Sequence, residues 1–196
     1  MAQAHLRWEP TLEFTPRWAQ AHRSNVVWNE PDNNHTWGPL IDLQDYARLY
    51  ETVRAAVHSV SRGARVMTGG LEWTHSSLPR LLKAFEGKPM DAVAIHPYAA
   101  TPGGTVAMAR SAIALMRAYG RGSTPVVVNE YGWTSVRGTW GSTRPRNVKP
   151  YASAALVGLA RLRLAEVLPF EWADASWGLN DGPFAKAVTQ ITHSRR

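Results

Sequence analysis

The stretches Val26-Val-Trp-Asn-Glu30 and Pro125-Val-Val-Val-Asn-Glu130 decide the fold of this chain. Each is a short apolar run, rich in β-branched residues, that ends in an Asn-Glu pair. Continuous runs of this kind are typical of strands in a parallel sheet that is covered on both faces. Because the carboxyl ends of parallel strands meet at one edge of the sheet, we expect both glutamates at that edge.

Three further strands and the helices between them follow the same alternation. Strands are predicted at 65–70, 91–96 and 167–172 in addition to the first two. Helices are predicted at 46–60, 78–85, 105–119, from about 150, and at 184–192. This βα repeat predicts an α/β fold with about five parallel strands. Five such units fit either a doubly wound open sheet or part of a (β/α)8 barrel, and their number alone does not separate the two.

Composition bounds the class of protein. The chain has 196 residues, 44% of them hydrophobic and 19% charged, which predicts a single globular domain over residues 1–196. It has no cysteine, which excludes disulfides, thiolate metal sites and a cysteine nucleophile. No apolar run approaches the ~20 residues of a membrane span. Residues 1–8 lack the pattern of a signal peptide, so the compartment stays open.

The charge is the only feature that favours a polyanion partner. Lys and Arg outnumber Asp and Glu by seven, and most of the excess is scattered arginine. Weak binding to anionic polymers follows from charge alone, and its mark is a steep loss of binding with salt. Because the sequence has no basic motif interleaved with aromatic residues, we expect no nucleic-acid partner.

Chemically reactive side chains gather at the predicted strand ends. Glu30 and Glu130 each end a strand, His96-Pro-Tyr98 ends another, and Glu171-Trp172 ends the last. Two carboxyl groups, one protonated and one ionised, are the minimum for cleaving a glycosidic bond. Several of the nine Trp lie near these ends, and an indole face suits the CH-rich face of a sugar ring. The pattern therefore indicates a carbohydrate-cleaving site.

Four motifs resemble clan A glycoside hydrolases, the retaining (β/α)8 enzymes that include cellulases, mannanases and β-xylosidases. The stretch 26–32 resembles their fourth-strand signature, and 125–133 resembles their seventh strand. His96-Pro-Tyr98 is similar to the His-x-Tyr of strand six, and 170–172 to strand eight. The resemblance runs from about residue 25 to 182, with the motifs in the family's order at βα spacing.

The resemblance implies a role for each matched residue. Glu30 is expected as acid/base and Glu130 as nucleophile, with carboxyl groups about 5–5.5 Å apart. Asn29 is expected to bind the sugar 2-hydroxyl. His96 and Tyr98 are expected to hold the carboxylates, and Trp172 to support the sugar ring. The family needs no cofactor, and its partner is a carbohydrate. Its members are often exported.

The chain departs from the family because nothing in it resembles strands one to three. We therefore expect a partial barrel with an open flank, in which Val27 and Val127 or Val128 lie partly in water. Such a chain is expected to self-associate, or to need a fragment that supplies the missing strands, and to have little activity alone. The alternative is a weak or inactive carbohydrate-binding remnant of such an enzyme.

Two smaller interpretations concern metals and the second strand end. His96, Glu130 and Glu171 could gather a metal ion, but no two of them have a ligand spacing such as His-x-x-x-His, so no metal is predicted. Glu72 and His75 follow the second strand, where they border a sugar subsite or, as we expect, belong to a solvated loop.

Overall fold

The computed structural model describes residues 24–138 and 141–170 of the chain. The strands are β1 (Ser24–Val27), β2 (Arg65–Thr68), β3 (Val93–Ile95), β4 (Val126–Val128) and β5 (Glu166–Val167). The helices are α2 (Leu43–Val60), α3 (Thr74–Ala84), α4 (Pro102–Ala118) and α5 (Val148–Ala160), the last preceded by the short 3₁₀ helix η1 (Pro145–Asn147). Strands and helices alternate, as the sequence predicts.

The order of the strands in space decides between the two candidate architectures. β1 pairs with β2 and β3–β4–β5 pair in that order, all in parallel. β2 and β3 are joined by the bridges Met67–Ala92 and Leu71–Ile95. The strands therefore follow one another in chain order, without the reversal that a doubly wound sheet requires. This is the order of a (β/α)8 barrel, and the described residues form an open part of one.

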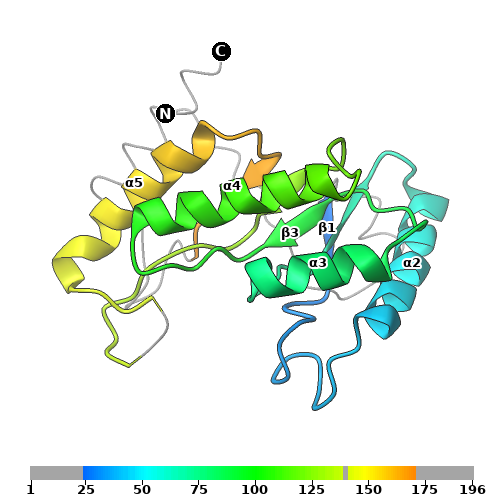
Figure 1. Ribbon diagram of the computed structural model, residues 1–196, viewed down its shortest axis with the longest axis horizontal. Helices are drawn as coiled ribbons and strands as arrows, with labels where there is room; N and C mark the ends of the chain where they lie inside the picture. Colours follow the sequence, from blue (N-terminus) through cyan, green and yellow to red (C-terminus); the bar gives the residue numbers. More distant parts are fainter. Residues whose placement is uncertain (1–23, 139–140, 171–196) are drawn as a thin grey trace.

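The helices cover one face of the strands in the same order. α2 contacts α3, α3 contacts α4, and α4 contacts α5. In Figure 1 they succeed one another from right to left, outside the strands. A ring of helices that follows the chain order is the outer layer expected of a barrel. None of the helices in the described ranges is long and apolar enough to cross a membrane.

Alternation along the strands divides the core in two. Val27, Val66, Val93, Ile95 and Val128 pack with the helices in the large cluster. Their strand neighbours form a separate small cluster on the concave face, made of Val26, Met67, Ala92, Ala94 and Val127. Because side chains alternate between faces, every second residue belongs to the would-be barrel interior.

A polar group lies below this small cluster, at the amino ends of the strands. The Ser24 hydroxyl donates to Glu166 Oε1 at 3.2 Å, and Arg65 Nη1 lies 3.0 Å from the same oxygen. The Glu166 side chain is only 8% exposed. Across the concave face, Glu166 of β5 is thus linked to β1 by the Ser24 hydrogen bond and to β2 by a partly buried ion pair with Arg65.

The structure corrects the expectation that interior valines face water. Val27, Val127 and Val128 have 0% exposure, and Val26 has 7%. Two observations explain it. Val27 and Val128 face the helices, and Val127 packs within the concave cluster. Small alanines and the contact of Ser24 with Glu166 also keep that face compact.

Most element boundaries agree with the sequence, and one helix shows why some do not. Asp42 begins α2 by accepting the N–H groups of Gln44 and Asp45. The sequence predicts a helix at 78–85, but α3 starts at Thr74 and holds Pro79 inside it. β5 starts one residue earlier than predicted, at Glu166. The predicted helix 184–192 and Trp172 lie outside the described residues.

Candidate active site

Glu30 lies in a constrained loop directly after β1. Trp28 and Glu30 have φ values of 70° and 44°, a region that non-glycine residues seldom adopt. The loop is held by Asn33, whose amide donates to Glu30 Oε2 at 3.2 Å and whose N–H donates to the Glu30 carbonyl. Thr36 donates to the same carbonyl. Strained backbone fixed by several hydrogen bonds is typical of functional sites.

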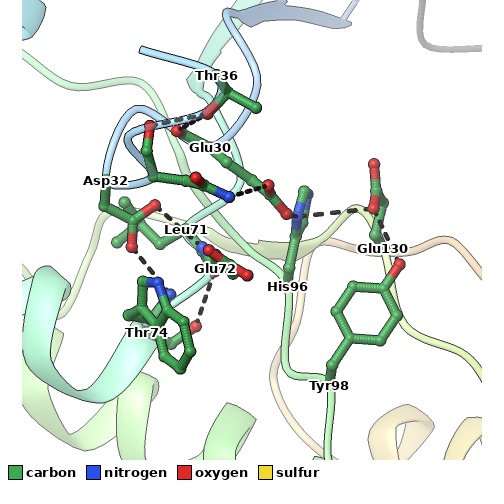
Figure 2. Close-up of polar contacts among 11 residues, drawn as sticks. Glu30, Asp32, Thr36, Leu71, Glu72, Thr74, His96, Tyr98 and Glu130 are labelled. Atoms are coloured by element: carbon green, nitrogen blue, oxygen red, sulfur yellow. Dashed lines mark hydrogen bonds and ion pairs between the residues drawn. The ribbon is translucent and has the colours of Figure 1, made fainter. Parts of the chain in front are cut away.

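His96 follows β3 and connects the two glutamates. It continues the alternation of Ala92 and Ala94, which puts its side chain on the concave face at the carboxyl end. The imidazole is fully buried, with Nδ1 2.9 Å from Glu30 Oε1 and 3.6 Å from Glu130 Oε2. Figure 2 shows the ring between the two carboxylates. His96 thus brings residues from three strands to one point.

Tyr98 fixes Glu130 from the other side. Its phenol donates to Glu130 Oε2 at 2.9 Å. Glu130 ends β4, two residues after the buried Val128, and its side chain is 25% exposed. Glu30 is 16% exposed. A carboxylate oxygen of each glutamate and a His96 nitrogen all lie within 4.8 Å of one another. The two carboxylates are therefore close together and open to a ligand.

The far side of His96 is packed against Gly70. His96 Nε2 is buried, and it has no hydrogen-bond partner within the described ranges. A Cβ on Gly70 would lie 2.0 Å from Nε2 and 2.6 Å from Asn129 Oδ1. The tautomer with its proton on Nδ1 suits this arrangement, since Nδ1 faces the carboxylates and Nε2 is left as an acceptor. Glycine at position 70 is what allows His96 to sit here.

The loop after β2 is tied to the loop that carries Glu30. The buried carboxylate of Asp32 accepts the N–H of Glu72 at 3.0 Å and that of Trp73 at 2.9 Å. This contact sets Glu72 close to Glu30, contrary to our expectation of a solvated loop (Figure 2). Burial raises the pKa of Glu72, the charges of Glu30 and Asp32 raise it further, and a Trp73 hydrogen bond opposes them.

A cavity of about 690 Å³ opens beside Glu30. Its wall comes from the loops after β1, β2 and β3 and from the helices α3 and α4. The lining residues are Glu30, Glu72, Trp73, Thr74, His75, Ser76, Tyr98, Ala99, Ala100 and Met108. The cavity lies at the carboxyl ends of the strands, where (β/α) folds bind their ligands.

The same cluster has the composition of a metal site. Glu30, His96 and Glu130 are the one set of three or more potential ligands found within the described residues. Two carboxylate oxygens and an imidazole nitrogen suit a divalent transition metal. However, His96 Nδ1 is the atom that faces both carboxylates, so a metal ion would have to replace the proton there. Glu171, the third ligand considered from sequence, lies outside the described residues.

The structure brings together four of the six residues predicted for the site. Glu30, His96, Tyr98 and Glu130 are joined by hydrogen bonds and ion pairs. Asn29 is half-buried beside them but forms none of these bonds. Trp172 lies outside the described residues, so its role stays a prediction.

Sequence reasoning missed three contributors. Asp32 reads as part of the turn cluster after the first strand, and its contact with the 72–73 backbone spans about forty residues. Glu72 was expected in solvent. From the sequence, Gly70 is interpreted only as the end of a predicted strand. The adjacent glycines 69 and 70 were the one available signal, since glycine in a strand often marks a close approach.

Comparisons with solved structures find enzymes of one kind. A GH128 endo-β-1,3-glucanase from Amycolatopsis mediterranei, solved with laminaritriose, is similar over 89% of this chain and 75% of its own, with a TM-score of 0.63 and 16% identity. A glucosidase from Croceicoccus marinus has a TM-score of 0.62 and 12% identity over 74% of this chain. A β-xylosidase from Caulobacter crescentus has a TM-score of 0.58 and 17% identity over 76% of this chain.

These similarities concern the fold. This chain spans 31% of the glucosidase and 33% of the xylosidase, about a third of each. Neither a family model nor a curated protein matches the sequence. The order of the strands and the structural matches together show that the chain has the fold of an open part of a (β/α)8 barrel, similar to that of these glycosidases.

Proposed function

We propose that the chain hydrolyses a β-glycosidic bond with retention of configuration. The observation that carries this proposal is the carboxylate pair, whose oxygens approach within 4.8 Å at the carboxyl ends of β1 and β4. Retaining enzymes hold their two carboxyl groups about 5–5.5 Å apart, whereas inverting enzymes leave about 6.5–9.5 Å for a water molecule. The short separation in this chain supports the first class.

The proposed reaction has two steps, and each can be written with its proton transfer and its bond changes. In the first step Glu130 Oε attacks the anomeric carbon, the bond to the leaving oxygen breaks, and Glu30 gives its proton to that oxygen. In the second step Glu30, now a carboxylate, takes a proton from water. The resulting hydroxide attacks the anomeric carbon, and the bond to Glu130 breaks. The net reaction consumes one water and restores both side chains.

The neighbouring groups suit these roles. Tyr98 donates to Glu130 Oε2, which orients the proposed nucleophile. His96 holds Glu30 through Nδ1, so the acid stays beside the nucleophile. Asn29 as ligand of the 2-hydroxyl and Trp172 as the ring platform complete the proposal, and both roles rest on the family resemblance. No step needs a cofactor.

The test is an assay of aryl β-glycosides of several sugars, with the product's anomeric configuration followed by proton NMR. The β-anomer is expected to appear first. Glu130→Gln is expected to abolish turnover, with Glu86→Gln, a glutamate at an exposed position, as the matched control. Glu30→Gln is expected to slow poor leaving groups far more than nitrophenol, which needs no proton. Release of the α-anomer, or turnover that survives Glu130→Gln, would contradict the proposal.

A carbohydrate-binding remnant without useful turnover is the second candidate. It is favoured by the five strands, which do not close a barrel within the described residues. Binding of a glycoside with no product release by the wild-type chain, at enzyme concentrations that would reveal one turnover per hour, decides for this candidate. Activity that appears on adding a fragment with three further strands decides for the enzyme.

A further inference from the structure

We infer that the cavity beside Glu30 takes a bulky apolar leaving group, an aryl or polycyclic alcohol, and not a second sugar. This inference rests on the proposed function and names the substrate class of that site. It follows from three properties of the cavity: its side of the carboxylate pair, the chemistry of its wall and its size.

The cavity is on the side of the proposed acid. Glu30 lies in its wall, whereas Glu130 does not. The attacked sugar must contact both carboxylates, and its leaving oxygen must reach Glu30 to receive the proton. A group that extends from that oxygen beyond Glu30, away from Glu130, enters this cavity. The cavity therefore belongs to the leaving group.

Most of the surface of the wall is apolar, although six of its ten described lining residues have polar side chains. Ala99, Ala100 and Met108 contribute methyl and thioether surface, and the Trp73 indole, 46% exposed, faces open space. Indole and thioether groups both favour contact with flat apolar rings. A smaller cavity of about 170 Å³ adjoins it and shares Thr74, His75 and Met108; its other lining residues are Ala107, Ser111, Ala112 and Leu115. The apolar lining thus continues between α3 and α4.

The hydroxyl groups in the wall already use their protons on the protein. Thr74 donates to the Leu71 carbonyl at 3.1 Å, and Ser76 donates to the Trp73 carbonyl at 3.2 Å. Tyr98 donates to Glu130. Among the described residues of the wall, Glu72 and His75 are the polar side chains that remain beside Glu30. A second sugar brings several hydroxyls that must exchange water for protein partners, and this wall offers few.

The size fits a large leaving group. A volume of about 690 Å³ lies inside the range of roughly 300–1,000 Å³ typical of sites for drug-sized ligands. A single phenol would leave much of it filled by water against apolar surface. A naphthol or a larger ring system covers Trp73 and reaches Met108, which buries apolar surface on both sides.

The test measures binding of two ligands that resist hydrolysis because sulfur replaces the leaving oxygen. One is a 2-naphthyl 1-thio-β-glycoside, and the other is the thio-linked disaccharide of the same sugar. Calorimetry on the full chain is expected to give at least tenfold tighter binding of the naphthyl ligand. Met108→Gln, which keeps the side-chain length, is expected to weaken naphthyl binding about fivefold, from the lost burial of apolar surface, and to leave the disaccharide within twofold. Val157→Gln on α5, outside the cavity wall, is the control.

Equal or tighter binding of the disaccharide, no effect of Met108→Gln, or no binding of either ligand would overturn the inference. A parallel assay with the oxygen-linked naphthyl glycoside separates it from the proposed function. If the naphthyl ligand binds more tightly but the chain shows no Glu130-dependent release of naphthol, the proposed hydrolysis is refuted and the inferred selectivity of the cavity stands. Turnover that prefers the disaccharide refutes the inference and leaves the hydrolysis standing.

Discussion

Gly70→Ala is the most informative perturbation of the site, because it acts on both carboxylates without altering either. The added Cβ would lie 2.0 Å from His96 Nε2 and 2.2 Å from Cδ2. An ordinary contact is about 3.4 Å, so the ring must retreat by about 1.4 Å. The retreat pushes Nδ1 toward Glu30 and Glu130, which it already contacts at 2.9 and 3.6 Å.

Two effects of this clash can be estimated. Overpacking a closely packed position costs about 1–3 kcal/mol in the free energy of unfolding. A displacement of about 1 Å in a catalytic group lowers the rate by about 100-fold. We therefore expect Gly70→Ala to lose about 1–3 kcal/mol of stability and about 100-fold in kcat, with a smaller change in KM. Urea unfolding and steady-state kinetics measure these quantities.

Two controls identify the cause. Gly63→Ala meets nothing within 4 Å, so its stability is expected to change little. In a His96→Ala background the imidazole is absent and the close approach to Asn129 Oδ1 at 2.6 Å remains, so adding Gly70→Ala is expected to cost less than it does in the wild type. If Gly70→Ala behaved like Gly63→Ala, or kept its full cost without the imidazole, the packing of His96 against Gly70 could not explain the site.

Three further changes test individual contacts. Tyr98→Phe removes the hydrogen bond to Glu130, and we expect kcat to fall about tenfold while urea unfolding changes by under ~1 kcal/mol; an unchanged kcat would show that Glu130 needs no such donor. Asp32→Asn keeps one oxygen that can accept an N–H group of the 72–73 backbone and replaces the other by an NH2 group, so the free energy of unfolding should fall by about 1–3 kcal/mol. The control is Asp42→Asn at the start of α2, where Asn caps a helix as well as Asp does, and its stability should not change. Glu72 has a raised pKa in the folded state, so the folded chain binds the proton more tightly and loses stability as pH rises through the interval between the ordinary and the raised pKa. Glu72→Gln should therefore be more stable than the wild type at pH 7 and equal to it below about pH 4, and a constant difference between the two pH values would refute this.

The strand ends are the part of the site that sequence predicts well. Parity explains the success: His96 follows Ala94 by two residues and Ala92 by four, so a correct strand fixes the side on which it lies. A different rule places Glu30 and Glu130 at one edge, since the carboxyl ends of parallel strands meet there. Local pattern and the geometry of a parallel sheet suffice for these residues.

The remaining parts depend on contacts between loops, which local pattern does not encode. Asp32 accepts a hydrogen bond from the backbone of Glu72, forty residues away, and this contact holds Glu72 partly buried near Glu30. The helix predicted from 78 begins four residues earlier, at Thr74, and holds Pro79 inside it. The buried state of Val127 likewise depends on the packing of residues from four strands together.

Covalent trapping tests the central claim most directly. The reagent is a 2-deoxy-2-fluoro β-glycosyl fluoride. Its 2-fluoro group slows both steps of a retaining enzyme, whereas its reactive fluoride leaving group speeds the first step, so the glycosyl-enzyme accumulates. Mass spectrometry of the digested chain, over a panel of sugars, is expected to find one added glycosyl group on the peptide that contains Glu130, and none in Glu130→Gln. A label on Glu30 instead, or no label with any sugar in a chain that turns over aryl β-glycosides, would contradict the assignment of Glu130 as nucleophile.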